Sequence, residues 1–204
     1  MTARPSQRPG GPRIGLLGGS FNPAHEGHLH ISLLALDHLA LDELWWLVSP
    51  QNPLKPTDGM AGYEARLAGA HELVDDPRIT VSDMERRLGT RYTADTLRAL
   101  NKRFPRTNFV WVMGADNLAQ ISSWRNWTAI FEAVPIAVFD RPTYSYGALG
   151  SGAARRYASS RIGQRQAHRL AGLAPPAWVL VRGTLYAASA TSIREARDGY
   201  DKDV

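Results

Sequence analysis

The sequence predicts an α/β fold in which a mostly parallel sheet is covered by helices on both faces. Short apolar runs, bounded by glycine or proline, alternate along the chain with longer stretches that have helical spacing. This alternation favours strand–helix–strand units, whose strands run parallel. In such sheets, ligands bind outside the carboxyl ends of the strands. Functional side chains are therefore expected in the loops that lead from strands into helices.

The predicted elements follow one another along most of the chain. Apolar runs with the length of a buried strand are Ile14–Leu17, Leu44–Val48, Ile79–Val81, Phe109–Met113, Ile136–Phe139 and Trp178–Val181. Helical spacing predicts helices over residues 27–40, 61–74, 92–103, 127–133, 153–171 and 191–198.

Length and composition predict one domain, over residues 13–204. A chain of 204 residues with 44% hydrophobic content can bury one good-sized core. Residues 1–12 contain turn and breaker residues without periodicity and are predicted to form a disordered tail. They lack the apolar segment of a signal peptide, and no apolar stretch approaches the length of a membrane span. We therefore expect a soluble, cytoplasmic protein without a membrane partner.

The charge balance leaves two kinds of partner open. A net charge of +5 and a pI near 9.8 suit either a nucleic acid or an enzyme that collects small anions. The positive excess comes almost wholly from arginine. No named nucleic-acid motif is present, so we expect no nucleic-acid partner. The absence of cysteine excludes disulfides, thiolate metal sites and a cysteine nucleophile.

The first predicted strand leads directly into a glycine loop that contains two histidines. Gly18 and Gly19 follow the strand, and His25 and His28 lie where the next helix begins. Glycine lets a backbone approach a ligand closely, and the N–H groups at a helix start attract an anion. Imidazole N–H groups in this place can donate to the oxygens of a triphosphate. A tight turn with surface histidines is the alternative interpretation.

Three better-known motifs do not fit this loop. A zinc protease needs a second histidine four residues after His25, and position 29 is leucine. The oxidoreductase fingerprint Gly-x-Gly-x-x-Gly is absent from Gly15–Ser20. A Walker loop needs Gly-Lys-Ser/Thr at the helix start, and that sequence is also absent.

At this loop the sequence resembles a known superfamily. Gly18–Pro23, followed by His25-x-Gly27-His28, is similar to the signature of the His-x-Gly-His nucleotidyltransferases. The resemblance implies a Rossmann-like nucleotidyltransferase fold and the transfer of a nucleotidyl group. It further implies that His25 and His28 are catalytic and that ATP contacts Gly18, Gly19, Ser20 and Phe21. Pantetheine-phosphate adenylyltransferases, cytidylyltransferases and, more distantly, class I aminoacyl-tRNA synthetases share the signature, so it indicates the chemistry before the substrate.

A second motif near the C-terminus resembles the other phosphate-binding sequence of this superfamily. Ser189–Arg194 is similar to Ser-Ser-Thr-x-Ile-Arg, in which hydroxyls and an arginine hold the ATP phosphates. The resemblance implies a catalytic role for Arg194 and ATP binding by Ser189, Thr191 and Ser192. Ala190 departs from the pattern and removes one possible phosphate donor. Capping of a helix is the structural alternative for Ser189.

Three further segments resemble the bacterial nicotinate-nucleotide adenylyltransferases. Pro50–Lys55 is similar to a loop whose lysine holds the mononucleotide phosphate, and Arg91–Leu97 to a loop that receives the acid group of the pyridine. Ser123–Trp127 is similar to a segment that places an aromatic face against the nicotinate ring. The mononucleotide-binding residues that the resemblance implies are Ser20, Asn52, Lys55, Tyr92, Thr93, Trp124 and Arg125.

Two more loops resemble the ATP side of that family, and structural alternatives remain for several residues. Met113–Leu118 is similar to a Gly-Ala-Asp loop and implies that Asp116 lies near the ATP ribose. Asp140–Pro142 is similar to a loop near adenine and makes Arg141 a candidate. Lys55 is alternatively a solvated charge, and Thr93 a helix cap. Tryptophan is more often a core residue than a ligand platform, so Trp127 is predicted to lie in the core.

Together the matches run from residue 14 to about 197 and imply one reaction. ATP would give its adenylyl group to nicotinate mononucleotide, forming deamido-NAD and pyrophosphate in NAD biosynthesis. Mg²⁺ would accompany ATP, because the sequence offers no carboxylate cage and no protein metal ligand is expected. A homo-oligomer is compatible with the sequence. The alternative enzyme is a pantetheine-phosphate adenylyltransferase, which is shorter and typically has threonine in place of His25.

Overall fold

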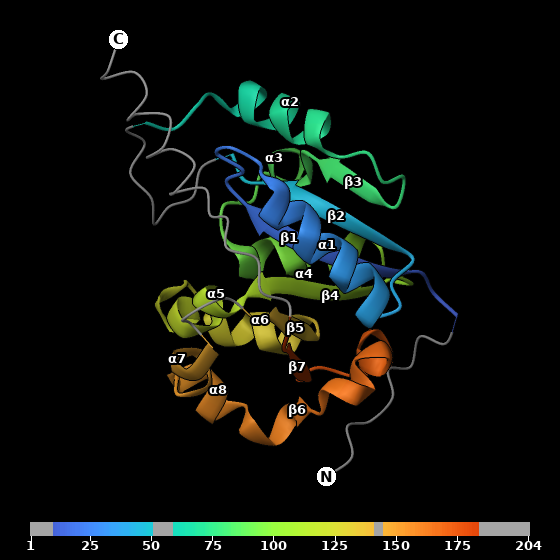
Figure 1. Ribbon diagram of the computed structural model, residues 1–204, viewed down its shortest axis with the longest axis vertical. Coiled ribbons are helices and arrows are strands. Elements are labelled where there is room, and N and C mark those ends of the chain that lie inside the picture. Colours follow the sequence, from blue (N-terminus) through green and yellow to red (C-terminus); the bar gives the residue numbers. More distant parts are fainter. Residues whose placement is uncertain (1–9, 51–58, 141–144, 184–204) are drawn as a thin grey trace.

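The structure, a computed structural model, describes residues 10–50, 59–140 and 145–183. Its strands form one seven-stranded sheet in the order β3-β2-β1-β4-β5-β7-β6, and every adjacent pair is parallel. In Figure 1 the strands succeed one another from β3, near the top, to β7 and β6, near the bottom. The parallel α/β fold predicted from the sequence is thus confirmed.

The six predicted strands are all present, and a short edge strand is added to them. The strands are β1 (Arg13–Gly19), β2 (Glu43–Val48), β3 (Ile79–Ser82), β4 (Asn108–Gly114), β5 (Ile136–Phe139), β6 (Arg161–Ile162) and β7 (Trp178–Val181). β1 continues past the apolar run because Gly18 and Gly19 still pair with β2. With two residues, β6 is too short to produce a periodic signal.

Successive side chains of each strand point to opposite faces, so the sheet separates two apolar cores. Along β4, Phe109, Trp111 and Met113 enter the first core, whereas Val110 and Val112 enter the second. The helices over the first core are α3 (Met84–Leu88), α4 (Thr93–Arg103), α5 (Ala115–Gln120), α6 (Trp127–Ala133), α7 (Ser145–Leu149) and α8 (Gly152–Arg156). The second core is covered by α1 (Glu26–His38), α2 (Tyr63–Leu73) and the 3-10 helix η3 (Gln164–Gly172).

Four of the predicted helices are confirmed to within two residues at each end. They correspond to α1, α2, α4 and α6. The short helices α3, α5 and α7, of five or six residues, were not predicted. The helix expected over residues 191–198 lies outside the described residues.

The single helix predicted over residues 153–171 is wrong. The chain instead forms α8, a 3-10 turn η2 (Ala158–Ser160), the strand β6 and the helix η3. The apolar pairs Ala154/Tyr157 and Ala167/Leu170 are three residues apart, a spacing that a 3-10 helix satisfies as well as an α-helix does. Between these pairs, β6 joins the edge of the sheet beside β7, which local periodicity cannot reveal.

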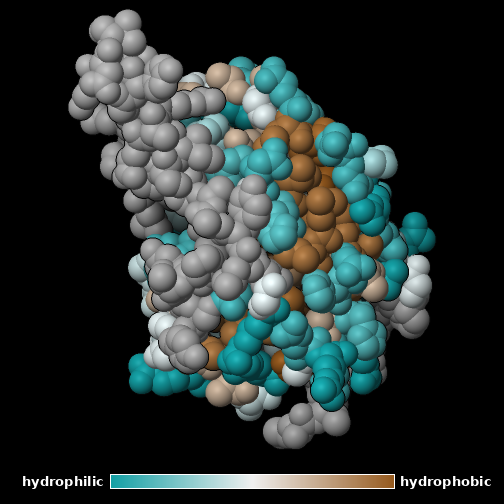
Figure 2. All heavy atoms as spheres, in the orientation of Figure 1, coloured by the Kyte–Doolittle hydropathy of each residue, from teal (hydrophilic) through white to brown (hydrophobic). Residues whose placement is uncertain are grey.

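The chain before β1 lies against the start of β4. The backbone N–H of Asn108 donates to the carbonyl of Pro12 at 2.8 Å, and its side-chain amide donates to the carbonyl of Gly11 at 3.3 Å. Figure 2 shows an apolar patch over α1, the helix that carries Leu33, the most exposed large hydrophobic residue of the described chain. No helix within the described ranges is both long and apolar enough to cross a membrane.

Candidate active site

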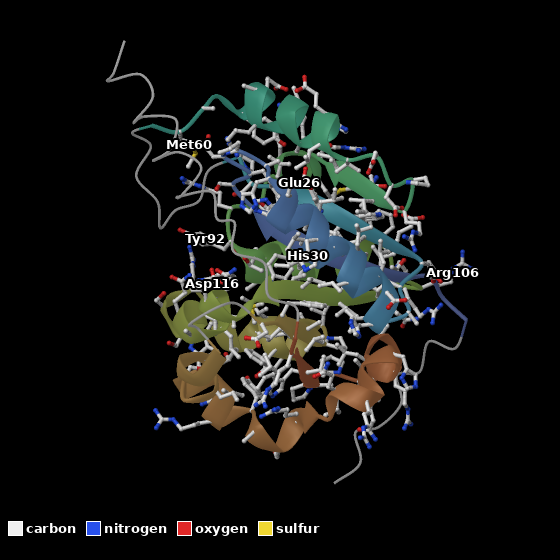
Figure 3. All side chains as sticks on the ribbon, viewed as in Figure 1. Glu26, His30, Met60, Tyr92, Arg106 and Asp116 are labelled. Carbon is white, nitrogen blue, oxygen red and sulfur yellow. The ribbon has the colours of Figure 1, made fainter. Side chains whose placement is uncertain are left out.

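The loops after β1 and β4 lie at the point where the winding of the sheet changes direction. β1 pairs with β2 on one side and with β4 on the other. The chain leaves β1 through α1, over the second core, and enters β4 from α4, over the first core. Ligands of parallel sheets bind at such a point. In Figure 3, Tyr92 and Asp116 lie on this side of the molecule, whereas Arg106, which precedes β4, lies on the opposite side.

Gly18 allows β1 to pack closely against β4. A Cβ atom at position 18 would lie 2.3 Å from Cη2 of Trp111, whose side chain is almost fully buried. Real Cβ atoms do not approach a carbon atom so closely, so any other residue would displace the indole ring or the strand. Glycine at this position therefore has a packing reason in addition to the predicted approach of a ligand.

Phe21 turns the chain from β1 towards α1 and supports His28. Its φ of 47° lies in the left-handed region, which is unusual for an aromatic residue. Its buried ring stacks on Trp46 of β2 with the ring centroids 4.9 Å apart, and it contacts the ring of His28 at 4.7 Å. The ring is therefore a support for His28, and the ATP contact of Phe21 stays a prediction, which we assign to its backbone.

His25 is the N-cap of α1. Its Nδ1 atom accepts a hydrogen bond from the backbone N–H of Gly27 at 3.1 Å, and the residue is 5% exposed. A ring nitrogen that accepts a hydrogen bond carries no proton, so the neutral imidazole of His25 carries its proton on Nε2. The cap therefore fixes the tautomer of His25 together with the start of the helix.

His28 completes a reciprocal cap with His25. The Nδ1 atom of His28 accepts from the backbone N–H of His25 at 3.2 Å. Glutamate or glutamine usually occupies this third helical position in a capping box. The two ring centroids are 3.8 Å apart. Both neutral imidazoles thus have Nε2–H as their donor, side by side at the start of a 13-residue helix, where anions are stabilised.

The first turn of α1 is fixed to the sheet below the two histidines. The hydroxyl of Ser32 donates to the carbonyl of His28 at 2.7 Å and accepts from the indole Nε1–H of Trp46 at 2.7 Å. Ser32 and Trp46 are both fully buried, so these hydrogen bonds are shielded from water. They hold the helix, and the imidazole pair at its start, in one orientation relative to β2.

The predicted Gly-Ala-Asp loop lies at the carboxyl end of β4, beside β1. Asp116 is the second residue of α5 and is half-buried. Asp140 follows β5, the next strand of the sheet, and its backbone N–H donates to the carbonyl of Val181 at 3.0 Å. Among the described residues, the loop after β1, the Gly-Ala-Asp loop after β4 and Asp140 after β5 thus all lie at the carboxyl ends of neighbouring strands.

Two predicted mononucleotide segments meet at the start of α4. Tyr92 is the N-cap of this helix, and its side chain makes no capping hydrogen bond. Thr93 is the first helical residue, so its hydroxyl does not provide the cap that the structural alternative required. The guanidinium carbon of Arg125 lies 4.6 Å from the centroid of the Tyr92 ring. Residues 33 positions apart in the chain are thereby brought into contact.

Trp124 and Trp127 both lie at the edge of the first core. Both side chains are half-buried and pack against that core. Trp127 begins α6, and its ring meets Phe131 and Tyr157 edge-on, with centroids 6.1 and 6.0 Å away. Trp127 therefore packs against the core, as predicted, but it lies at the border of the core and is only partly buried.

A buried polar cluster lies behind the start of α4. Glu85 in α3 is 6% exposed, and the Thr96 hydroxyl donates to its carboxylate at 3.5 Å. The same hydroxyl is 2.9 Å from that of Thr90 and 3.3 Å from the Tyr92 carbonyl. Burial raises the pKa of Glu85 to about 7, although hydrogen bonds from Ser49 and Thr96 oppose the rise. The sequence analysis missed this cluster because α3 is too short to show a periodic buried face.

Several predicted site residues lie outside the part of the chain that the structure describes. These are Asn52, Lys55, Arg141, Ser189, Thr191, Ser192 and Arg194. Among the residues that are described, no three side chains of histidine, aspartate or glutamate are grouped so that they could hold a metal ion.

A sequence model of a family described as cytidylyltransferase-like matches residues 16–196, which is most of the chain. The chain therefore belongs to the cytidylyltransferase-like family of nucleotidyltransferases.

Relatives place the chain more narrowly, among the nicotinate-nucleotide adenylyltransferases. A protein from Parvibaculum lavamentivorans, named probable nicotinate-nucleotide adenylyltransferase, is 54% identical over 185 residues, which are 91% of this chain and 92% of the relative. A protein of the same name from Bradyrhizobium sp. (strain ORS 278) is 52% identical over 182 residues, which are 89% of this chain and 95% of the relative.

A solved structure shares the fold. The nicotinic acid mononucleotide adenylyltransferase of Plasmodium falciparum, complexed with NaAD, superposes with a TM-score of 0.67 and 15% identity, covering 90% of this chain and 83% of that one. The Rossmann-like nucleotidyltransferase fold expected from the sequence is thereby confirmed.

Proposed function

We propose that this chain transfers the adenylyl group of ATP to nicotinate mononucleotide, forming nicotinate adenine dinucleotide, the deamido form of NAD, and releasing pyrophosphate in NAD biosynthesis. The observation that carries the proposal is the pair of imidazoles of His25 and His28 at the start of α1, whose Nδ1 atoms accept backbone N–H groups and whose ring centroids lie 3.8 Å apart. Donors at a helix start suit phosphate oxygens. The acceptor is inferred from the relatives, which are 54% and 52% identical to this chain.

The reaction requires alignment and charge stabilisation, and it requires no protein base. A phosphate oxygen of nicotinate mononucleotide, ionised at neutral pH, attacks the α-phosphorus of ATP in line. The new P–O bond forms as the bond to pyrophosphate breaks, and pyrophosphate leaves with the electron pair. Because the two substrates repel each other, holding them together contributes much of the acceleration. His25 and His28 would donate to phosphate oxygens as charge moves onto the leaving group.

The other predicted contacts divide between the two substrates. On the ATP side, the ends of β1 and β4 supply glycine backbone and a carboxylate near the ribose. The proposed ATP contacts are Gly18, Gly19, Ser20, the backbone of Phe21, Asp116, Arg141, Ser189, Thr191, Ser192 and Arg194. The proposed mononucleotide contacts are Ser20, Asn52, Lys55, Tyr92, Thr93, Trp124 and Arg125.

The start of α4 suits the acid group of the pyridine. Because the Tyr92 side chain makes no capping hydrogen bond, the first backbone N–H groups of this 11-residue helix can donate to a ligand. The helix dipole favours a negative charge at the same place. Arg125, over the ring of Tyr92, adds a guanidinium beside it. A carboxylate, which only accepts hydrogen bonds, matches this set of donors.

Magnesium is proposed to enter with ATP as part of the substrate. Mg²⁺ commonly binds substrate phosphates and keeps several waters, so it needs few protein ligands. The described residues include no cluster of three side chains that could hold a metal ion. We also propose a cytoplasmic location, because the reaction consumes ATP.

The direct test is the reaction of the purified chain with MgATP and nicotinate mononucleotide. We expect pyrophosphate release only when both are present, and a product with the mass of nicotinate adenine dinucleotide. Controls replace ATP by CTP, and the mononucleotide by phosphopantetheine. Faster adenylyl transfer to phosphopantetheine would replace the proposed substrate by that of the alternative enzyme.

A further inference from the structure

Arg66 is a buried cation that no predicted motif includes. It lies in α2, four residues before the buried Ala70 and on the same face of the helix, and it is 4% exposed. Burial lowers the pKa of its guanidinium, yet arginine keeps its proton in proteins. A buried charge is expensive unless its hydrogen bonds are satisfied, so its contacts are expected to matter.

The guanidinium of Arg66 donates to backbone carbonyls from three separate segments. Nη1 donates to the carbonyls of Ser20 and Ser49, the latter at 2.9 Å. Nη2 donates to the carbonyl of Pro50 at 2.9 Å, and Nε to that of Ala61 at 3.1 Å. These carbonyls belong to the loop after β1, the end of β2 and the segment that enters α2. One planar group thus connects all three.

Asn22 joins two of the same segments. Its side-chain oxygen accepts from the backbone N–H of Ala61 at 3.0 Å, and its amide donates to the carbonyl of Gly59 at 3.2 Å. Asn22 is 9% exposed, so these hydrogen bonds are also shielded. The loop between β1 and α1 is therefore held at two places by hydrogen bonds between side chains and backbone. Arg66 binds the carbonyl of Ser20, and two residues later the side chain of Asn22 binds the segment that enters α2.

We propose that Arg66 is a positioning residue of the adenylyl transfer: its guanidinium fixes the loop after β1, and through this loop His25 and His28, against the end of β2 and the start of α2. This inference rests on the proposed function. Ser20 follows the strand end at Gly19 and lies five residues before His25, so a shift at Ser20 moves the backbone that carries the imidazoles. A displacement of about 1 Å can lower a rate about a hundredfold.

The planar fork of arginine explains why this residue type is needed. Several N–H donors in one plane reach carbonyls from different directions, whereas the ammonium of lysine is a compact charge with three donors. The hydrogen-bond acceptors described for Arg66 are backbone carbonyls, which carry no net charge. Because these acceptors do not neutralise the guanidinium, Arg66 also brings positive charge to a loop predicted to bind phosphates.

The test compares Arg66→Lys and Arg66→Met with Arg78→Met, an exposed arginine that directly precedes β3, at the amino ends of the strands and away from the loop after β1. Single-turnover rates are measured with enzyme in saturating excess, well below the lowest melting temperature, so that only folded molecules contribute. We expect a fall of at least about tenfold for Arg66→Lys, a larger fall for Arg66→Met, and no change for Arg78→Met. Hydrogen exchange of residues 18–28 should accelerate in Arg66→Lys and stay unchanged in Arg78→Met.

The outcomes separate positioning from simple stabilisation. A lower melting temperature with a single-turnover rate within twofold of the wild type would overturn the proposal, and so would unchanged exchange over residues 18–28. If Arg66→Met does not fold, Arg66→Lys decides. If the wild type itself does not transfer AMP to nicotinate mononucleotide, the proposed function fails, and the exchange experiment still judges whether Arg66 fixes the loop.

Discussion

At the scale of single residues, the two histidines combine a structural role with a proposed chemical role on different ring atoms. Nδ1 of each imidazole accepts a backbone N–H at the start of α1, from the N-cap residue His25 or from Gly27, which leaves Nε2–H as the donor of the neutral ring. Replacement of either histidine by alanine removes both roles at once. A variant that restores only the cap can separate them.

We predict that His28→Ala lowers kcat about a hundred- to a thousandfold and that His28→Gln does not restore it. Loss of one preorganised donor to a developing charge has effects of this size. The cap itself is worth about 1 kcal/mol, and glutamine at the third helical position can accept the same backbone N–H. His28→Gln should therefore melt close to the wild type while its kcat stays low. Wild-type kcat in His28→Gln would mean that capping is the whole role of His28.

At the scale of elements, the contact between β1 and β4 depends on the absence of a side chain. We predict that Gly18→Ala lowers the free energy of unfolding by about 1–3 kcal/mol, since its Cβ would overlap a buried indole ring. Gly69→Ala in α2 is the matched control, because a Cβ there meets no atom within 4 Å. Its effect should be neutral or stabilising by up to about 1 kcal/mol.

Urea unfolding of a double variant checks the cause. Trp111→Phe removes the part of the ring that Gly18 faces, so Gly18→Ala should be less damaging in that background, by roughly 0.5–3 kcal/mol. Equal losses in both backgrounds would show that the indole contact is not what requires glycine at position 18.

The packing of α3 against α4 makes stability depend on pH through Glu85. Its folded-state pKa of about 7 lies above its ordinary value of 4.5, because burial disfavours the carboxylate. The folded state therefore binds this proton more tightly than the unfolded state. The contribution to stability is complete below pH 4.5 and is lost as the pH rises through about 7.

We predict that Glu85→Gln becomes more stable than the wild type as the pH rises. The amide keeps the shape and stays neutral, so the difference in unfolding free energy should be small near pH 4.5 and reach roughly 3 kcal/mol above pH 7. Thermal melting across this range measures it, with the exposed Glu72→Gln on α2 as the control. A difference that does not change between pH 5 and 8 would contradict a raised pKa.

At the scale of the whole molecule, loops for both proposed substrates lie on the side of the sheet where the strands have their carboxyl ends. The imidazole pair follows β1, Asp116 follows β4, and Tyr92 begins α4, which leads into β4. In the proposed contact with Trp124, the acid and the amide of the pyridine would present the same aromatic face, so stacking would favour neither. Discrimination between them is expected from the start of α4.

We predict at least a tenfold preference for nicotinate mononucleotide over its nicotinamide counterpart. The amide would place its NH₂ donor against backbone N–H donors and leave a polar group unpaired, which costs about 1–3 kcal/mol. The measurement is the ratio of kcat/KM for the two mononucleotides at fixed MgATP. A ratio within threefold of unity would refute the assignment of the acid group to the loop at Tyr92 and Thr93.

The sequence by itself determined the parallel α/β fold and most of its core elements, and it predicted the chemistry of the loop after β1. These features depend on local spacing: apolar runs of strand length, helical periodicity, and glycines and histidines within one short stretch. Local spacing failed where tertiary contacts prevail, as over residues 153–171, where β6 joins the sheet edge.

Only the tertiary structure decided which groups hold the candidate site in place. Arg66 reaches Ser20 across 46 positions of the chain, and Arg125 covers Tyr92 across 33. Burial, which sets the pKa of Glu85, arises when several helices close over the sheet. The tautomers of His25 and His28 depend on which ring atom meets a backbone N–H. A sequence specifies the residues, but distances between segments far apart in the chain exist only after folding, and these distances determine the hydrogen bonds.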